Sequence, residues 1–261
     1  MDDRAWVVYR EALGGEYYRL RLRPAEPFGA EPGQFVMLQV GEGIDPLLRR
    51  PFSIHRVDPL TGGEFEVLFR VAGRGTSMLA RRHVGDRVDV LGPLGRGFSL
   101  DAEAPILVGG GVGVAPLLFL AESFLDRGVR PRLVLGARSD RDLLCHGDFA
   151  CLSVPCELVT EDGSLGRMGL VTASLERVLR EVGGPARVYA CGPMPMLRAV
   201  VDLCASHGVG CEVSLEAHMA CGVGACLGCV VPAAGGGYLR VCKDGPVFRG
   251  SQIAWIASVG G

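Results

Sequence analysis

Four cysteines crowd a short glycine-rich stretch near the carboxyl end of this 261-residue chain. They are Cys221, Cys226, Cys229 and Cys242, with the spacing C-x4-C-x2-C-x12-C. Clustered thiols serve three chemistries, namely a structural zinc ion, a set of disulfide bonds, or an iron–sulfur cluster. Each of them forces the surrounding backbone into a compact turn, so this stretch restricts the possible folds more than any other feature of the chain.

The spacing of the thiols favours the iron–sulfur cluster. Structural zinc sites usually combine close ligand pairs, whereas this segment has one C-x2-C pair and only His218 nearby, which we interpret as a surface or helix-end residue. The order C-x4-C-x2-C…C is that of plant-type [2Fe–2S] proteins, although the last cysteine follows sooner than in plant ferredoxins. Glycines between the thiols leave backbone N–H groups free to approach sulfur. We therefore predict a [2Fe–2S] cluster held by the four cysteines.

Composition argues against several classes of protein. The formal net charge is −2 and no basic stripe is present, so we expect no nucleic-acid partner. The longest apolar stretch, residues 105–121, is interrupted by GGGVGVAP and is too short for a membrane span. The first residues lack the apolar core of a secretory signal, and ten cysteines then imply a reducing compartment, where disulfides are rare. We expect a cytoplasmic protein.

Short strand-like runs separated by turns fill the first part of the chain. The clearest runs are Tyr17–Arg23, Gln34–Val40, Glu64–Val71 and Arg87–Leu91. Many short alternating strands are typical of a small antiparallel barrel. We therefore predict a β-barrel domain over residues 1–100.

Two loops of this barrel have the composition of a phosphate site. One is the run RPFSI at 50–54, and the other is GRGTSM at 73–78, which opens an expected short helix, Ser77–Arg82. A glycine-rich turn that enters a helix presents free N–H groups to an anion, and Arg50 could add a charge-assisted contact. Taken singly, the first run is better explained as an edge strand after a proline and the second as an ordinary loop, because short motifs often match by chance.

Together the two loops resemble the FAD-binding barrel of the ferredoxin reductase superfamily. In that superfamily the first loop holds the flavin and its phosphates, and the second covers the pyrophosphate. The resemblance implies FAD contacts at Arg50, Pro51, Phe52, Ser53, Phe69, Arg70, Val71, Gly75 and Thr76.

After residue 100 the pattern of apolar residues along the chain changes. Apolar runs of strand length, from 106–108 to 210–213, alternate with helical stretches. The expected helices are Pro116–Arg127, Asp140–Ala150, Leu170–Val182 and Met194–Ser206. Such alternation predicts a parallel sheet covered by helices on both faces. We assign residues 101–209 to this α/β nucleotide-binding domain and residues 210–261 to a small cluster domain.

Two motifs of the α/β domain indicate a nicotinamide cofactor. The first strand runs into GGGVGVAP, in which glycines let the backbone approach a diphosphate at a helix start. G-G-G-x-G-x-x-P followed by C-G-P resembles the nicotinamide-binding half of the same superfamily, where the second motif lies beside the nicotinamide ring. The implied cofactor contacts are Gly109, Gly110, Gly111, Gly113, Pro116, Cys191, Gly192 and Pro193.

The residues leave the choice between NADH and NADPH open. The expected ribose-end loop, residues 136–140, contains both Arg138, which would suit a 2′-phosphate, and Asp140, which would suit a free ribose. The resemblance described next favours NADH.

The whole chain, and MACGVGACLGCVV…VCKDGPVF most of all, resembles the electron-transfer subunits of NAD-dependent dihydroorotate dehydrogenase. The resemblance implies an FMN-containing catalytic partner in a heterotetramer of two of each subunit, with electrons from dihydroorotate reaching NAD⁺. A flavin must connect hydride chemistry with a one-electron cluster, and hydride transfer needs no acid or base, so no catalytic side chain is expected. The alternatives are a reductase subunit serving a hydrogenase or a ferredoxin:NADP⁺ oxidoreductase, a zinc-binding interaction module, and a standalone flavin or oxygenase reductase.

Overall fold

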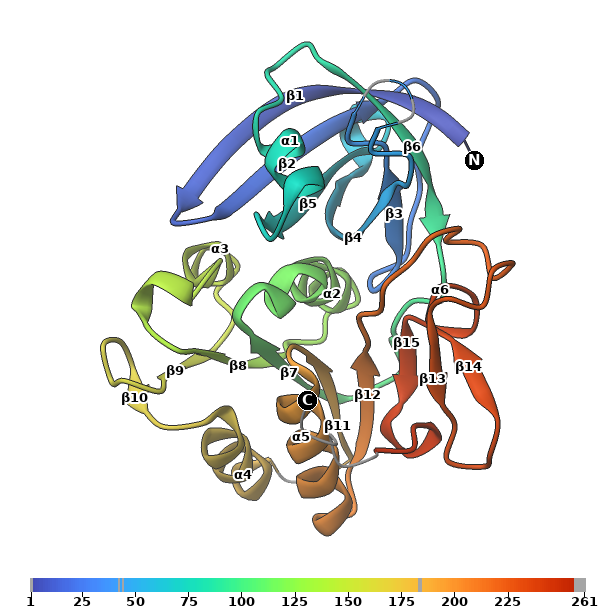
Figure 1. The fold of residues 1–261 in the computed structure, drawn as a ribbon. Coiled ribbons are helices and arrows are strands. Elements are labelled where there is room, and N and C mark those ends of the chain that lie inside the picture. Colours follow the sequence, from blue (N-terminus) through green and yellow to red (C-terminus); the bar gives the residue numbers. More distant parts are fainter. Residues whose placement is uncertain (1, 42, 44, 183–184, 256–261) are drawn as a thin grey trace.

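The computed structural model of the chain describes residues 2–41, 43, 45–182 and 185–255. A closed barrel lies over a central sheet with helices on both faces, and a small carboxyl-terminal segment packs beside both (Figure 1). This arrangement confirms the expected fold class of barrel, α/β domain and small cluster segment.

The barrel consists of six antiparallel strands in the order β1-β2-β5-β4-β3-β6. The strands are β1 (Asp2–Gly14), β2 (Tyr17–Pro24), β3 (Phe35–Leu38), β4 (Arg50–Asp58), β5 (Glu64–Arg70) and β6 (Arg87–Leu94). Alternate side chains such as Leu20 and Leu22 fill its interior, as the two-residue period of a strand requires. Helix α1 (Arg74–Ala80) follows β5 and buries Leu79 against the barrel core, and it begins three residues earlier than expected. A short 3₁₀ turn, η1 (Pro59–Thr61), joins β4 to β5.

The central sheet has seven strands in the order β10-β9-β8-β7-β11-β12-β15. They are β7 (Ala104–Gly110), β8 (Arg132–Ala137), β9 (Cys156–Thr160), β10 (Arg167–Met168), β11 (Ala186–Cys191), β12 (Gly210–Ser214) and β15 (Val247–Arg249). All neighbouring pairs are parallel except β12 and β15. The order reverses between β7 and β11, and ligands of open α/β sheets bind at the carboxyl ends of strands at such a reversal.

Helices cover both faces of the sheet, as expected (Figure 1). They are α2 (Ala115–Asp126) and α3 (His146–Cys151) on one face, and α4 (Val171–Glu181) and α5 (Met194–Ser206) on the other. Along β7, Leu107 packs with α2, whereas Ile106 and Val108 pack with α4 and α5. The expected helix Asp140–Ala150 is instead a 3₁₀ turn, η3 (Asp140–Asp142), followed by α3, because Cys145 has a left-handed backbone (φ 60°) that interrupts a helix.

The cysteine-rich segment is inserted between two strands of the sheet. It contains β13 (Val230–Pro232), β14 (Tyr238–Arg240) and α6 (Val241–Asp244), and after β15 the turn η4 (Gly250–Gln252) follows. Strands β12 and β15 are hydrogen-bonded into the central sheet and so pair with the α/β domain. The expected cluster domain, residues 210–261, includes both of these strands. Within the described residues, no helix is long and apolar enough to cross a membrane.

Candidate cofactor sites

The four cysteines of the predicted cluster lie on two facing stretches, a loop that follows β12 and helix α6. Backbone N–H groups donate to three of their sulfur atoms. The N–H of Gly224 lies 3.1 Å from the Sγ of Cys242, and the N–H of Cys242 lies 3.4 Å from the Sγ of Cys229. The N–H of Gly228 lies 3.5 Å from the Sγ of Cys226. Such donors offset the negative charge of thiolate ligands.

Backbone N–H groups also act on the fourth sulfur, that of Cys221. Backbone N–H groups, that of Cys226 first and those of Val223 and Ala225 after it, lower the pKa of the Cys221 thiol to about 6. Burial raises the pKa of the Cys242 thiol to about 12, yet a thiol that coordinates a metal is deprotonated. The loop is therefore shaped to hold thiolates.

The sulfur atoms form two contacting pairs, Cys221 with Cys226 and Cys229 with Cys242. In the described part of the chain, no group of three or more His, Cys, Asp or Glu side chains surrounds a single metal position. His218 is exposed, and all ten cysteines are free thiols. The four cysteines remain the predicted ligands of the cluster.

The cluster loop is buried on one side and open on the other. Cys229 and Cys242 are each only 2% exposed, whereas Cys226 is exposed and its neighbour Leu227 is 60% exposed. A cluster held here would have one side within the protein and the other at the molecular surface.

The predicted flavin motif lies at the start of β4. Its side chains alternate, so that Phe52 points into the barrel core while Pro51 and Ser53 remain half-buried on the outer face. Phe52 meets Phe69 edge to face, with ring centroids 5.4 Å apart, inside the barrel. Both side chains are buried in the barrel, and the predicted FAD contacts of Phe52 and Phe69 stay predictions.

The two predicted phosphate loops meet in space. A Cβ on Gly75 would lie 3.0 Å from the Nε of Arg50, so the arginine lies directly over the glycine-rich loop. The Thr76 hydroxyl accepts hydrogen bonds from the N–H groups of Ala72 and Gly73, so it stabilises the loop itself.

Farther along the same face, Arg70 forms an ion pair with Glu16, and the N–H of Val71 donates to the carbonyl of Glu16. Both residues are thereby bound to the β1–β2 hairpin. Their predicted FAD contacts stay predictions.

The predicted nicotinamide motifs meet at the reversal between β7 and β11. Gly109 and Gly110 end β7, and Gly111 and Gly113 form the turn η2 (Gly111–Val114) that leads to Pro116 in α2. A Cβ on Gly113 would lie 2.5 Å from the carbonyl oxygen of Cys191.

Equally close approaches hold the second motif. A Cβ on Gly110 would lie 2.5 Å from the Met196 Sδ, and a Cβ on Gly192 would lie 2.5 Å from the Met196 Cε. At Gly110 and Gly192 the nearest obstacle is the flexible Met196 side chain, whereas at Gly113 it is backbone, so Gly113 is the position where glycine is needed. Burial raises the pKa of the Cys191 thiol well above its usual range, so it stays protonated, while Pro193 is exposed.

Sequence reasoning missed part of the expected ribose-end edge. Arg138 is exposed after β8, but the N–H of Glu161 donates to Ala137 and that of Asp162 to Arg138. Glu161 and Asp162, which follow β9, therefore lie at the same sheet edge as Arg138. Sequence reasoning alone points only to Arg138 and Asp140 for the ribose end of the cofactor. The parallel order of β8 and β9, which places their carboxyl ends together, is the signal that reveals them.

The three sites are neighbours. A Cβ on Gly222 of the cluster loop would lie 2.7 Å from the Met37 Cγ on β3, and Met37 is the strand partner of Pro51 in the flavin motif. On its other side β4 packs against α2, which begins at the nicotinamide loop. The flavin strand is therefore adjacent to both the cluster loop and the nicotinamide loop.

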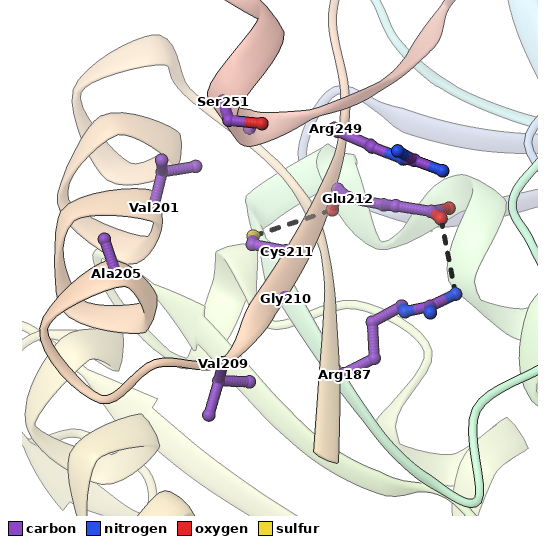
Figure 2. Close-up of a pocket in the computed structure, with 10 residues that line it drawn as sticks. Arg187, Val201, Ala205, Val209, Gly210, Cys211, Glu212, Arg249 and Ser251 are labelled. Atoms are coloured by element: carbon purple, nitrogen blue, oxygen red, sulfur yellow. Dashed lines mark hydrogen bonds and ion pairs between the residues drawn. The ribbon is translucent and has the colours of Figure 1, made fainter. Parts of the chain in front are cut away.

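A cavity of about 310 Å³ lies elsewhere, between α5, β12 and η4 (Figure 2). Arg187 and Glu212, 3.8 Å apart, lie at one side of it, and Val201 and Ala205 of α5 at the other. Since Arg187 and Gly210 stand at the amino ends of β11 and β12, this cavity is at the wrong end of the sheet for a nucleotide.

Comparison with known families accounts for all three parts. Residues 13–98 match the oxidoreductase FAD-binding domain, residues 107–202 the oxidoreductase NAD-binding domain, and residues 216–254 the iron–sulfur cluster binding domain of dihydroorotate dehydrogenase B. The matched domains confirm the expected cofactors FAD, NAD and an iron–sulfur cluster.

Individual relatives agree with these matches. The dihydroorotate dehydrogenase B (NAD(+)) electron transfer subunit of Desulforamulus reducens is 42% identical, over 97% of this chain and 98% of the relative. The subunit of the same name from Geobacillus thermodenitrificans is 45% identical, over 85% of this chain and 86% of the relative. A solved NADH-dependent reduced ferredoxin–NADP oxidoreductase is similar with a TM-score of 0.85 and 30% identity, over 96% of this chain and 90% of that one. The ferredoxin reductase in carbazole 1,9a-dioxygenase, at 24% identity and a TM-score of 0.70 over 80% and 66%, shares the fold. The expected resemblance is confirmed, and the chain belongs to the family of dihydroorotate dehydrogenase B (NAD(+)) electron transfer subunits.

Proposed function

We propose that the chain carries electrons from an FMN-containing dihydroorotate dehydrogenase subunit to NAD⁺, in pyrimidine biosynthesis. The observation that carries the proposal is that the flavin strand is adjacent to both other sites, to the cluster loop through Met37 and to the nicotinamide loop through His55. When bound, FAD exchanges a hydride for single electrons and a [2Fe–2S] cluster carries single electrons, so a flavin beside both sites would join the two kinds of chemistry.

The protein residues bind and orient rather than react. Arg50 and Gly75 would hold the phosphates of the flavin, and Pro51 and Ser53 would border its ring. Gly113 would place the nicotinamide beside the turn that follows β11. With Cys191 neutral and buried, no side chain is assigned to proton transfer.

The exposed side of the cluster loop is where the partner would dock. Cys226 and Leu227 are both exposed there, which supports electron exchange with another polypeptide. The names of the relatives, electron transfer subunits, support the existence of a catalytic partner. The further proposals of a heterotetramer with two of each subunit and a cytoplasmic location rest on the family resemblance and the reducing compartment expected from the cysteines.

The test is a Cys226→Ser variant co-expressed with the FMN subunit. It should lose iron and acid-labile sulfide and most dihydroorotate-dependent NAD⁺ reduction, because one of four sulfur ligands is missing. Reduction of an artificial dye by NADH through FAD should survive. Cys151→Ser, which changes an exposed thiol outside the cluster segment, serves as the matched control. Full dihydroorotate-to-NAD⁺ activity without the cluster would refute the electron route.

A second candidate is a subunit of a ferredoxin–NADP oxidoreductase, favoured by the 30% identity over 96% of the chain. The partner decides between the two. Co-purification with an FMN subunit that oxidises dihydroorotate supports the first, and ferredoxin-dependent activity without dihydroorotate oxidation supports the second.

A further inference from the structure

A buried histidine on the flavin strand forms a hydrogen bond with the end of the nicotinamide loop. His55 lies on β4, two residues after Ser53, and is 0% exposed. Its Nδ1 lies 2.6 Å from the carbonyl oxygen of Ala115, the residue that directly precedes Pro116. Because a carbonyl only accepts hydrogen bonds, Nδ1 carries the proton and donates it.

A second set of contacts fixes the other ring nitrogen. The Nε2 of His55 lies 3.9 Å from the Sγ of Cys145, which therefore donates its thiol proton. Arg19 donates to the same sulfur at 3.7 Å and forms a two-point ion pair with Asp148 at 2.6 and 3.1 Å. Burial lowers the pKa of His55 and the Arg19 cation lowers it further, so the ring is neutral and has a single N–H.

We infer that His55 is a positioning residue that sets the distance and angle between the flavin strand and the nicotinamide loop. The inference rests on the proposed function, since it requires FAD along β4 and the nicotinamide beside the GGGVG loop. His55 touches neither cofactor in this role and exchanges no proton. It acts through the carbonyl of Ala115, at the point where the loop becomes helix α2.

The size of the effect follows from the geometry that hydride transfer requires. Reacting atoms must lie about 3–3.5 Å apart, and a displacement of about 1 Å costs about 100-fold in rate. The Ala115 carbonyl begins α2 and is placed to accept a helical hydrogen bond as well, so loss of the His55 donor chiefly removes the contact that holds the start of α2 to β4. The loop is then free to shift relative to the flavin strand.

The molecule offers a matched control in Arg56, the next residue along β4. Its guanidinium pairs with Glu122 of α2 at 2.6 Å, so it joins the same two elements. That pair is half-buried, with the Arg56 side chain 44% and the Glu122 side chain 16% exposed, and Glu122 lies farther along α2 than Ala115. If simple docking of β4 on α2 were enough, both contacts would matter equally.

The experiment compares His55→Asn, His55→Gln and Arg56→Gln in the full chain loaded with FAD. An asparagine nitrogen takes the place of Nδ1, whereas a glutamine nitrogen reaches the position of Nε2 and gives up the hydrogen bond to the Ala115 carbonyl. Flavin reduction by NADH is followed anaerobically by stopped flow. We expect the limiting rate to fall at least about tenfold in the Gln variant, with weaker flavin–nicotinamide charge-transfer absorbance, and to stay within about threefold of wild type in the other two.

Equal limiting rates in the Gln variant and wild type would overturn the inference, as would an equal loss in all three variants. FAD content and Tm report whether each variant folds. Should the Gln variant not fold, His55→Ala with added imidazole replaces it, and restoration of the rate by imidazole supports the inference while its absence opposes it. Failure of NADH to reduce the wild-type flavin would instead refute the proposed function.

Discussion

Replacing Gly113 by alanine tests whether close contact of two backbone loops creates the nicotinamide site. The added Cβ would lie 2.5 Å from the carbonyl oxygen of Cys191 and 2.6 Å from the Cα of Gly192. Ordinary van der Waals contact begins at 3.4 Å, so one loop must move by about 0.9 Å. Neither obstacle is a flexible side chain, so the strain cannot relax by a rotamer change.

The displacement predicts the size of two separate effects. Overpacking of a close-packed region costs about 1–3 kcal/mol of unfolding free energy. A shift of about 1 Å between reacting groups lowers the rate of hydride transfer about 100-fold. The FAD loops around Arg50 and Gly75 are on the barrel, so FAD content should not change.

The assay is anaerobic reduction of the bound flavin by NADH, measured over a range of NADH concentrations. Gly147→Ala is the control, because a Cβ there meets nothing within 4 Å and alanine favours the helix α3. A Gly113→Ala protein with the limiting rate and NADH affinity of wild type would refute the assignment of this contact to the nicotinamide site.

Three further outcomes are expected. Gly224→Ala should reduce the iron and sulfide bound after reconstitution several-fold, because Gly224 has a φ of +83° and its N–H donates to Cys242. Burial and the hydrogen bond to Asp142 raise the pKa of Tyr17 to about 12. This bond therefore stabilises the fold below about pH 10 and is lost as the pH rises to about 12. In Tyr17→Phe that part of the alkaline fall in Tm should be absent, and a fall identical to that of wild type would contradict the prediction. The Leu227→Asn variant should bind the FMN subunit at least about tenfold more weakly, with its cofactor content unchanged. Asparagine is chosen because it suits the left-handed backbone at this position (φ 57°). An unaltered affinity in titration calorimetry would count against docking at this loop.

The sequence predicted the local elements well where a pattern is strong. Helix α5 runs over Met194–Ser206 as expected, because its apolar period and the following glycine mark both ends. The expected helix Asp140–Ala150 was wrong, because the left-handed backbone at Cys145 is held by contacts to Arg19 and His55 that no local pattern contains. The strand 210–213 was also expected, but its pairing with β15, beyond the cysteine segment, was not.

What the sequence determined by itself is the chemistry of each site, since thiol spacing and glycine runs act over a few residues and depend on little else. It predicted the cysteine ligands, the two flavin loops and the two nicotinamide loops. Only the tertiary structure decided which of these sites are neighbours. Gly222 meets Met37, and His55 meets Ala115, across separations in the chain that only a folded core can close. Electron transfer depends on those distances, and they are set by packing between domains rather than by any single motif.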